Sequence, residues 1–150
     1  MDTSKFGDII KFAIAREETA YKTYGEMSEK AETPGLKDLL LELQAEEKNH
    51  KKLLQDITET GVDNLETHEV IDLKISDYLT EEPPTPDMSF QDLLIHAAKK
   101  EQEAVDLYSN MKEAIKSDDL KKLFDFLIEQ EKTHKLKLET EYEKHVLDEG

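Results

Sequence analysis

The two halves of this sequence repeat each other, and this repeat narrows the range of folds sharply. When the sequence is shifted by 84 residues, so that Phe6 lies over Phe90, residues 6–54 align without a gap with residues 90–138. One period of this length is too long for the repeating unit of a solenoid. In each copy, apolar residues recur at helical spacing in two segments that are separated by a short turn. The repeat therefore predicts two copies of a helical hairpin.

Four helices are expected, and each of them has a residue that can cap its start. The capping residues are Thr3 or Ser4, Thr33, Ser89 and Ser117. The first helix is expected to reach about Ala31 and the second about Thr60. Short turns make the helices of each hairpin antiparallel, and an up-down bundle buries all four apolar stripes. The predicted fold is an all-α, ferritin-like four-helix bundle.

A single domain is expected to cover residues 1–150. It consists of a first hairpin at about 4–60, a long crossover at about 61–89 and a second hairpin at about 90–146. The middle of the crossover, HEVIDLKISDYL (68–79), is predicted to form a short helix that packs on the bundle.

Composition excludes several classes of protein. The chain has no cysteine, which rules out disulfides, thiolate catalysis, cysteine-ligated zinc and iron–sulfur centres. Its net charge of −16 argues against nucleic acid and against an anionic membrane surface as partners. No signal peptide is expected from the N-terminal residues, and no apolar stretch approaches the roughly 18 residues of a membrane span. The cytoplasm is therefore the expected location.

Two glutamates lie in apolar stripes where leucine would be expected. On a helical wheel of about 100° per residue, Glu17 falls near the centre of the stripe of the first helix. Glu101 occupies the same place in the third helix. The two residues are repeat mates, so both are predicted to point into the bundle.

The other two helices each carry a Glu-x-x-His motif. In the fourth helix, Glu131 and His134 lie on either side of the midline of the stripe. In the second helix, Glu46 and Glu47 flank the stripe about equally, next to His50. The repeat decides between them, because Glu47 recurs as Glu131, whereas Glu46 does not recur as an acid. A spacing of three residues places Glu and His on one face of the helix.

Four buried carboxylates need partners. An unpaired buried charge costs several kcal/mol, and the whole fold is stable by only about 5–15 kcal/mol. The wheels place no lysine or arginine on these faces, so a pair of metal ions is the expected source of positive charge. One Glu-x-x-His motif alone is typical of a solvated helix, but two motifs in register with two central glutamates indicate a metal site. The predicted ligands are Glu17, Glu47, His50, Glu101, Glu131 and His134.

Four carboxylates and two imidazoles suit iron or manganese. Zinc is not excluded by residue type. No catalytic residue is predicted beyond the metal centre, and two tyrosines are candidates for supporting it. Tyr24 and Tyr108 each follow a central glutamate by seven residues, in AREETAYKTY and KKEQEAVDLY. Two interpretations stay open for them, a hydrogen bond to a ligating carboxylate or a place in the apolar core.

The remaining histidines are not expected to bind metal. His96 points away from its apolar stripe and is predicted to lie at the surface. His145 lies three turns beyond the second Glu-x-x-His motif and is predicted to pack at the end of the bundle. His68 falls in the crossover and has no assigned role.

With these motifs the chain resembles the ferritin-like di-iron carboxylate superfamily, and rubrerythrin-type domains in particular. The resemblance covers nearly the whole chain and implies two iron ions, with manganese or a mixed pair as alternatives. It implies that Glu47 and Glu131 bridge the metals. Glu17 and His50 would then serve one ion, and the corresponding residues of the second half, Glu101 and His134, the other.

Two departures separate the chain from rubrerythrins proper. Those proteins carry an extra carboxylate one turn after the third-helix glutamate, where this chain has Ala104, with Ala20 as its repeat mate. They also usually carry a cysteine-ligated rubredoxin module, which a chain without cysteine cannot form. Both departures bring the site nearer to the general di-iron oxidase or ferroxidase pattern.

The resemblance implies a redox protein of oxidative stress that reacts with hydrogen peroxide or dioxygen and takes electrons from an external donor. A ferroxidase that handles iron is the alternative, and a structural protein held together by metal is a third interpretation. A homodimer is compatible with all three.

Overall fold

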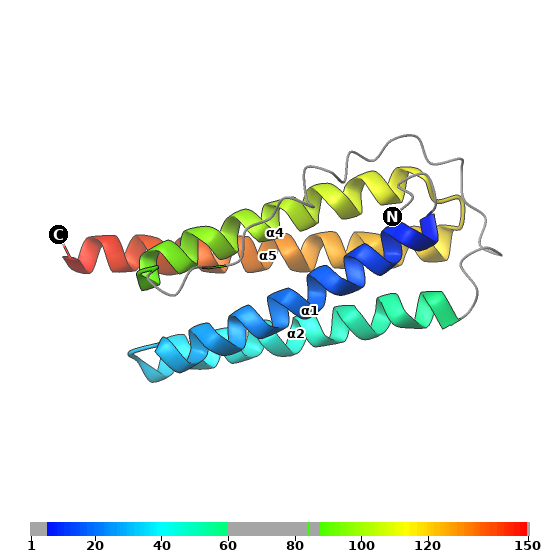
Figure 1. Ribbon diagram of the computed structural model, residues 1–150. Coiled ribbons are helices and arrows are strands. Elements are labelled where there is room, and N and C mark those ends of the chain that lie inside the picture. The colour runs from blue at the N-terminus through cyan, green and yellow to red at the C-terminus, as the bar shows by residue number, and fades with distance from the viewer. Residues whose placement is uncertain (1–5, 60–83, 85–87, 150) are drawn as a thin grey trace.

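The computed structural model describes residues 6–59, 84 and 88–149, and these form an all-α bundle (Figure 1). Its helices are α1 (Phe6–Lys30), α2 (Pro34–Glu59), α4 (Phe90–Glu113) and α5 (Asp118–Glu149). Helices α1 and α2 form one antiparallel hairpin, and α4 and α5 form the other. The predicted fold class is confirmed. The crossover helix expected at 68–79, His68 and the caps expected at Thr3 or Ser4 lie outside the described residues.

Three helix starts have the predicted caps. The Thr33 hydroxyl accepts a hydrogen bond from the backbone N–H of Leu36 at 3.3 Å, and that of Ser117 accepts one from Leu120 at 3.3 Å. At the start of α4, Ser89 and Asp92 form a capping box in which each side chain accepts from the backbone N–H of the other. These bonds satisfy N–H groups that have no partner within the helix.

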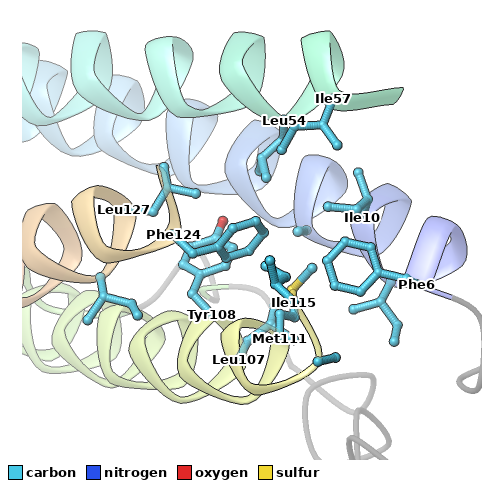
Figure 2. Close-up of a cluster of buried hydrophobic side chains, with 14 of the residues drawn as sticks. Phe6, Ile10, Leu54, Ile57, Leu107, Tyr108, Met111, Ile115, Phe124 and Leu127 are labelled. Carbon is cyan, nitrogen blue, oxygen red and sulfur yellow. The ribbon is translucent and has the colours of Figure 1, made fainter. Parts of the chain in front are cut away.

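Apolar side chains fill both ends of the bundle. At the end where α1 begins, Phe6 and Ile10 pack with residues of the other three helices around the fully buried Phe124 (Figure 2). A second apolar cluster, which contains Leu40, Leu43 and Leu94, fills the opposite end. All four helices run through both clusters, so the middle of each helix is held between two water-excluding layers.

Within the part of the chain that the structure describes, no helix is both long enough and apolar enough to cross a membrane.

Candidate metal centre

The six predicted ligands lie together in the layer between the two apolar clusters. Helices α1 and α4 supply Glu17 and Glu101, while α2 and α5 supply one Glu-x-x-His motif each. Every one of the six is completely buried, at 0% exposure: Glu17, Glu47, His50, Glu101, Glu131 and His134. Side chains of these types are seldom fully buried without a partner of opposite charge or a metal ion.

The six residues form two overlapping groups. One contains Glu17 and His50, and the other contains Glu101 and His134. Glu47 and Glu131 belong to both. In each group, one donor atom from every member lies within 4.8 Å of the others. Two neighbouring positions for an ion, with two carboxylates common to both, follow from this arrangement.

Each histidine directs its Nδ1 atom at three carboxylates. The Nδ1 atom of His50 lies 3.6 Å from Oε2 of Glu17, 3.3 Å from Oε1 of Glu47 and 3.0 Å from Oε1 of Glu131. The corresponding atom of His134 lies 3.1, 3.4 and 3.5 Å from oxygens of Glu47, Glu101 and Glu131, respectively. The imidazole rings are stacked, with centroids 5.8 Å apart and planes 12° from parallel. The second half of the chain thus reproduces the geometry of the first.

One buried atom of each of the six side chains lacks a hydrogen-bond partner. These atoms are Oε2 of Glu17, Oε1 of Glu47, Nδ1 of His50, Oε2 of Glu101, Oε1 of Glu131 and Nδ1 of His134. They are also the atoms that converge on one another in the two groups. Leaving a buried polar atom unpaired costs about 1–3 kcal/mol, and more for a charged group. Six such atoms at one level of the bundle fit the donor set of metal ions.

The outer nitrogen of each histidine is held by the opposite hairpin. Nε2 of His50 lies 2.9 Å from the amide oxygen of Gln130, and Nε2 of His134 contacts a carboxylate oxygen of Glu46. An Nε2–H group that donates to such an oxygen leaves the lone pair of Nδ1 directed into the site. Sequence reasoning did not assign this role to Gln130 or Glu46. The signal was present, because the two are repeat mates that both offer an acceptor oxygen.

The two tyrosines also contact the opposite half of the repeat. The hydroxyl of Tyr24 donates to Oε1 of Glu101 at 2.6 Å, and that of Tyr108 donates to Oε1 of Glu17. Burial and the nearby carboxylates raise the pKa of both tyrosines well above its ordinary value, so both remain protonated donors. Both rings are also part of the apolar clusters, so the two open interpretations hold together.

The expectation that no lysine or arginine reaches these carboxylates is wrong. Arg16 extends into the site, with only 7% of its side chain exposed. Its Nη1 atom donates to Oε1 of Glu17, to Oε2 of Glu47 at 2.6 Å and to Oε2 of Glu131. Its Nη2 atom donates to Oε1 of Glu101 at 3.0 Å. The wheel failed here because a long side chain can reach a buried face from the edge of a stripe.

One guanidinium does not neutralise four carboxylates. Burial and the charge of Glu47 raise the pKa of Glu17 to about 7, although Arg16 lowers it. Burial alone would lower the pKa of His134, but the negative charges of Glu101 and Glu47 beside its Nδ1 atom outweigh this and raise the pKa to about 10. Both shifts favour proton uptake, which is the response of a site with excess negative charge. Bound cations would relieve the same excess.

The other described histidines lie outside the cluster. His145 packs against Phe90, with ring centroids 5.4 Å apart, at the end of α5. His96 is partly buried in the wall of a pocket between α1 and α4. This pocket has a volume of about 250 Å³, and Arg16, Tyr24 and Glu101 of the site contribute to its lining.

Comparison with known proteins agrees with the geometry. No curated protein matches the chain. A Thermotoga maritima protein proposed to be a ferritin-like diiron-carboxylate protein is 25% identical, with a TM-score of 0.75, over 97% of this chain and 99% of that chain. A hypothetical protein from Pyrococcus furiosus is 24% identical, with a TM-score of 0.69, over 93% and 89%. A conserved hypothetical protein from Mycobacterium tuberculosis is 12% identical, with a TM-score of 0.65, over 93% and 98%. The last two show the fold alone. The model of the family described as Rubrerythrin matches residues 8–142, nearly the whole chain, and the protein therefore belongs to the rubrerythrin family.

Proposed function

We propose that this protein binds two iron ions in the six-residue cluster and is a redox protein that reduces hydrogen peroxide or dioxygen with electrons from an external donor. The observation that carries the proposal is the set of six buried donor atoms without hydrogen-bond partners, one from each predicted ligand. Membership of the rubrerythrin family and the likeness to a Thermotoga maritima protein proposed to be a diiron-carboxylate protein support the choice of iron.

The two overlapping groups support a distinct role for each proposed ligand. Glu47 and Glu131 belong to both groups and would bridge the ions. Glu17 and His50 would complete one site, and Glu101 and His134 the other. Carboxylate oxygens together with imidazole nitrogens suit iron and manganese. Two bound iron ions would supply electrons and polarise the O–O bond of the oxidant, which takes up two electrons and two protons when peroxide is reduced to water.

The side chains around the ligands prepare the centre for this chemistry. Gln130 and Glu46 fix the orientation of the imidazoles, so that the ligating nitrogens need not reorganise. Tyr24 holds one carboxylate oxygen of Glu101, and Tyr108 holds one of Glu17. The other oxygen of each carboxylate stays directed inward. The apolar clusters above and below keep bulk water away, which strengthens the electrostatic interactions within the site.

A second candidate function, the oxidation of ferrous ions that are themselves the substrate, is favoured by one observation. Ala104, only 1% exposed, packs in the core where rubrerythrins proper carry an extra carboxylate. An apolar residue at this position suits a simpler centre that oxidises ferrous iron.

Anaerobic reconstitution separates these functions. Protein loaded with two equivalents of ferrous iron is mixed with hydrogen peroxide or with dioxygen, and the ferric absorption in the near ultraviolet is followed. Multiple turnovers in the presence of an artificial reductant and peroxide support the peroxidase. Turnover that depends on excess ferrous ion supports iron oxidation.

Glu131→Gln serves as the control, because it removes a shared ligand with little change in shape. A bound centre that neither oxidant oxidises would overturn both redox functions and leave a structural role for the metals.

A further inference from the structure

Arg16 is the single cation that contacts all four carboxylates of the site among the contacts that the structure describes. Its Nη1 atom donates to Glu17, Glu47 and Glu131, and its Nη2 atom to Glu101. Nη2 also lies 3.4 Å from the backbone carbonyl of Lys100 on α4, so the guanidinium spans from α1 to the opposite hairpin. With 7% of its side chain exposed, this arginine is part of the interior of the bundle.

The guanidinium binds carboxylate oxygens other than those that converge, without hydrogen-bond partners, at the centre of the cluster. It holds Oε2 of both Glu47 and Glu131, whereas Oε1 of each is without a hydrogen-bond partner. If Glu47 and Glu131 bridged two ions, each through both of its oxygens, each would need its Oε2 atom, which Arg16 holds. Two divalent ions also balance four carboxylates by themselves, which would leave the guanidinium as an unpaired charge in a medium of low dielectric.

We infer that Arg16 is an internal cation that competes with metal ions for Glu47 and Glu131, and that its side chain leaves the cluster when the ions bind. This inference rests on the proposed metal centre and adds to it a step that sets metal affinity. In the absence of metal, Arg16 lowers the electrostatic cost of the buried acids. The same contacts must be broken on loading, which weakens the apparent affinity of the site.

A place for the displaced side chain lies next to it. The pocket of about 250 Å³ between α1 and α4 includes Arg16 in its lining, together with Tyr24 and Glu101 from the site. Thr19 and Thr23, about one and two turns further along α1, line the same pocket, and Thr19 is exposed to solvent. Rotation of the arginine side chain into this pocket would bring its guanidinium towards water.

Three variants test the competition. Arg16→Met removes the charge but keeps much of the apolar stem, and Arg16→Lys keeps the charge but cannot contact four carboxylates in the same fork geometry. Lys48→Met is the matched control, because Lys48 is exposed and directly follows Glu47 in the chain. Zinc, which is diamagnetic and not oxidised, is titrated into each metal-free protein against a chromophoric chelator.

Arg16→Met is expected to bind zinc at least about tenfold more tightly than the unchanged protein, Arg16→Lys to fall between them, and Lys48→Met to stay within about twofold. The melting temperature of metal-free Arg16→Met should fall by several degrees, since four acids lose their shared counter-ion. Equal or weaker zinc binding by Arg16→Met would overturn the inference and make Arg16 a fixed partner of the loaded centre.

A measurement on the unchanged protein does not depend on how the variants fold. The side-chain nitrogens of Arg16, labelled with ¹⁵N, should give slowly exchanging signals without metal and rapidly exchanging signals after two equivalents of zinc. If the protein bound zinc and these signals stayed unchanged, displacement of Arg16 would be rejected, but the proposed metal centre would not. If neither the unchanged protein nor Arg16→Met bound metal, both this inference and the proposed function would fail.

Discussion

The overlap of the two ligand groups predicts a graded response to the loss of single ligands. His50 belongs to one group, His134 to the other, and Glu131 to both. Leucine in place of either histidine keeps most of the side-chain volume without a donor atom and should remove one metal ion from the site. Glutamine in place of Glu131 should remove both.

The size of the effect can be worked out as a melting temperature. An ion at a free concentration of 100 times its dissociation constant stabilises the folded state by about 2.7 kcal/mol, so two ions bound at this level give about 5 kcal/mol. For a chain of this length, each kcal/mol corresponds to about 2–4 °C. Metal should therefore raise the melting temperature of the unchanged protein by roughly 10–20 °C. The rise should be about half as large for His50→Leu or His134→Leu, and close to zero for Glu131→Gln.

Circular dichroism at 222 nm is the suitable probe, because the protein is helical and has no tryptophan. The metal content of each variant, measured after desalting, gives an independent count of two, one or zero ions. If His50→Leu lost both ions, or if Glu131→Gln kept one, the bridging role of the shared carboxylates would be refuted. If all three variants kept the full rise, the metal would bind elsewhere.

Three further predictions concern the support of the site. Tyr24→Phe and Tyr108→Phe remove the hydroxyls that hold Glu101 and Glu17, so each should weaken metal binding by about 10- to 100-fold while the helix content stays the same; unchanged affinity in a chelator competition would make these rings core residues only. Glu46→Gln copies the acceptor found at Gln130 and should keep near-native affinity, whereas Glu46→Ala should lose about tenfold or more; equal titration curves for the two variants would contradict the orienting role. Phe124→Ala empties a fully buried position at one end of the bundle and should lower the free energy of unfolding by about 3–5 kcal/mol in urea, but a folded variant that no longer binds two ions would show that this cluster shapes the site directly.

The fold and the burial of the six residues in one cluster could be predicted because the repeat shows the same pattern twice. On α2 the wheel alone could not choose between Glu46 and Glu47, and the comparison with α5 decided it. The structure buries Glu47 completely and leaves Glu46 at the edge, where it contacts His134. A sequence without the repeat would have left this pair undecided.

The sequence did not reveal two contacts, which depend on the length of a side chain and on the axial position of one helix relative to another. Arg16 directly precedes Glu17 and therefore lies about 100° from it on the wheel, so only the length of its side chain allows it to cross to α4. The contact of Gln130 with His50 depends on the axial position of α5 relative to α2. The periodicity within one helix does not determine this position. Both are long-range properties of the assembled bundle.

Neither hairpin contains a complete metal site. The group around His50 takes Glu131 from the second hairpin, and the group around His134 takes Glu47 from the first. The tyrosines and the acceptors for the imidazoles follow the same rule, since each supports a ligand of the other half. Metal binding at the proposed centre would therefore be coupled to the docking of the two hairpins, and an isolated hairpin should hold neither ion tightly. Such coupling alone would serve a purely structural metal. Arg16 already neutralises part of the charge of Glu47 and Glu131 by its ion pairs with both, so the bundle depends less on metal for its stability than it would with four unpaired carboxylates.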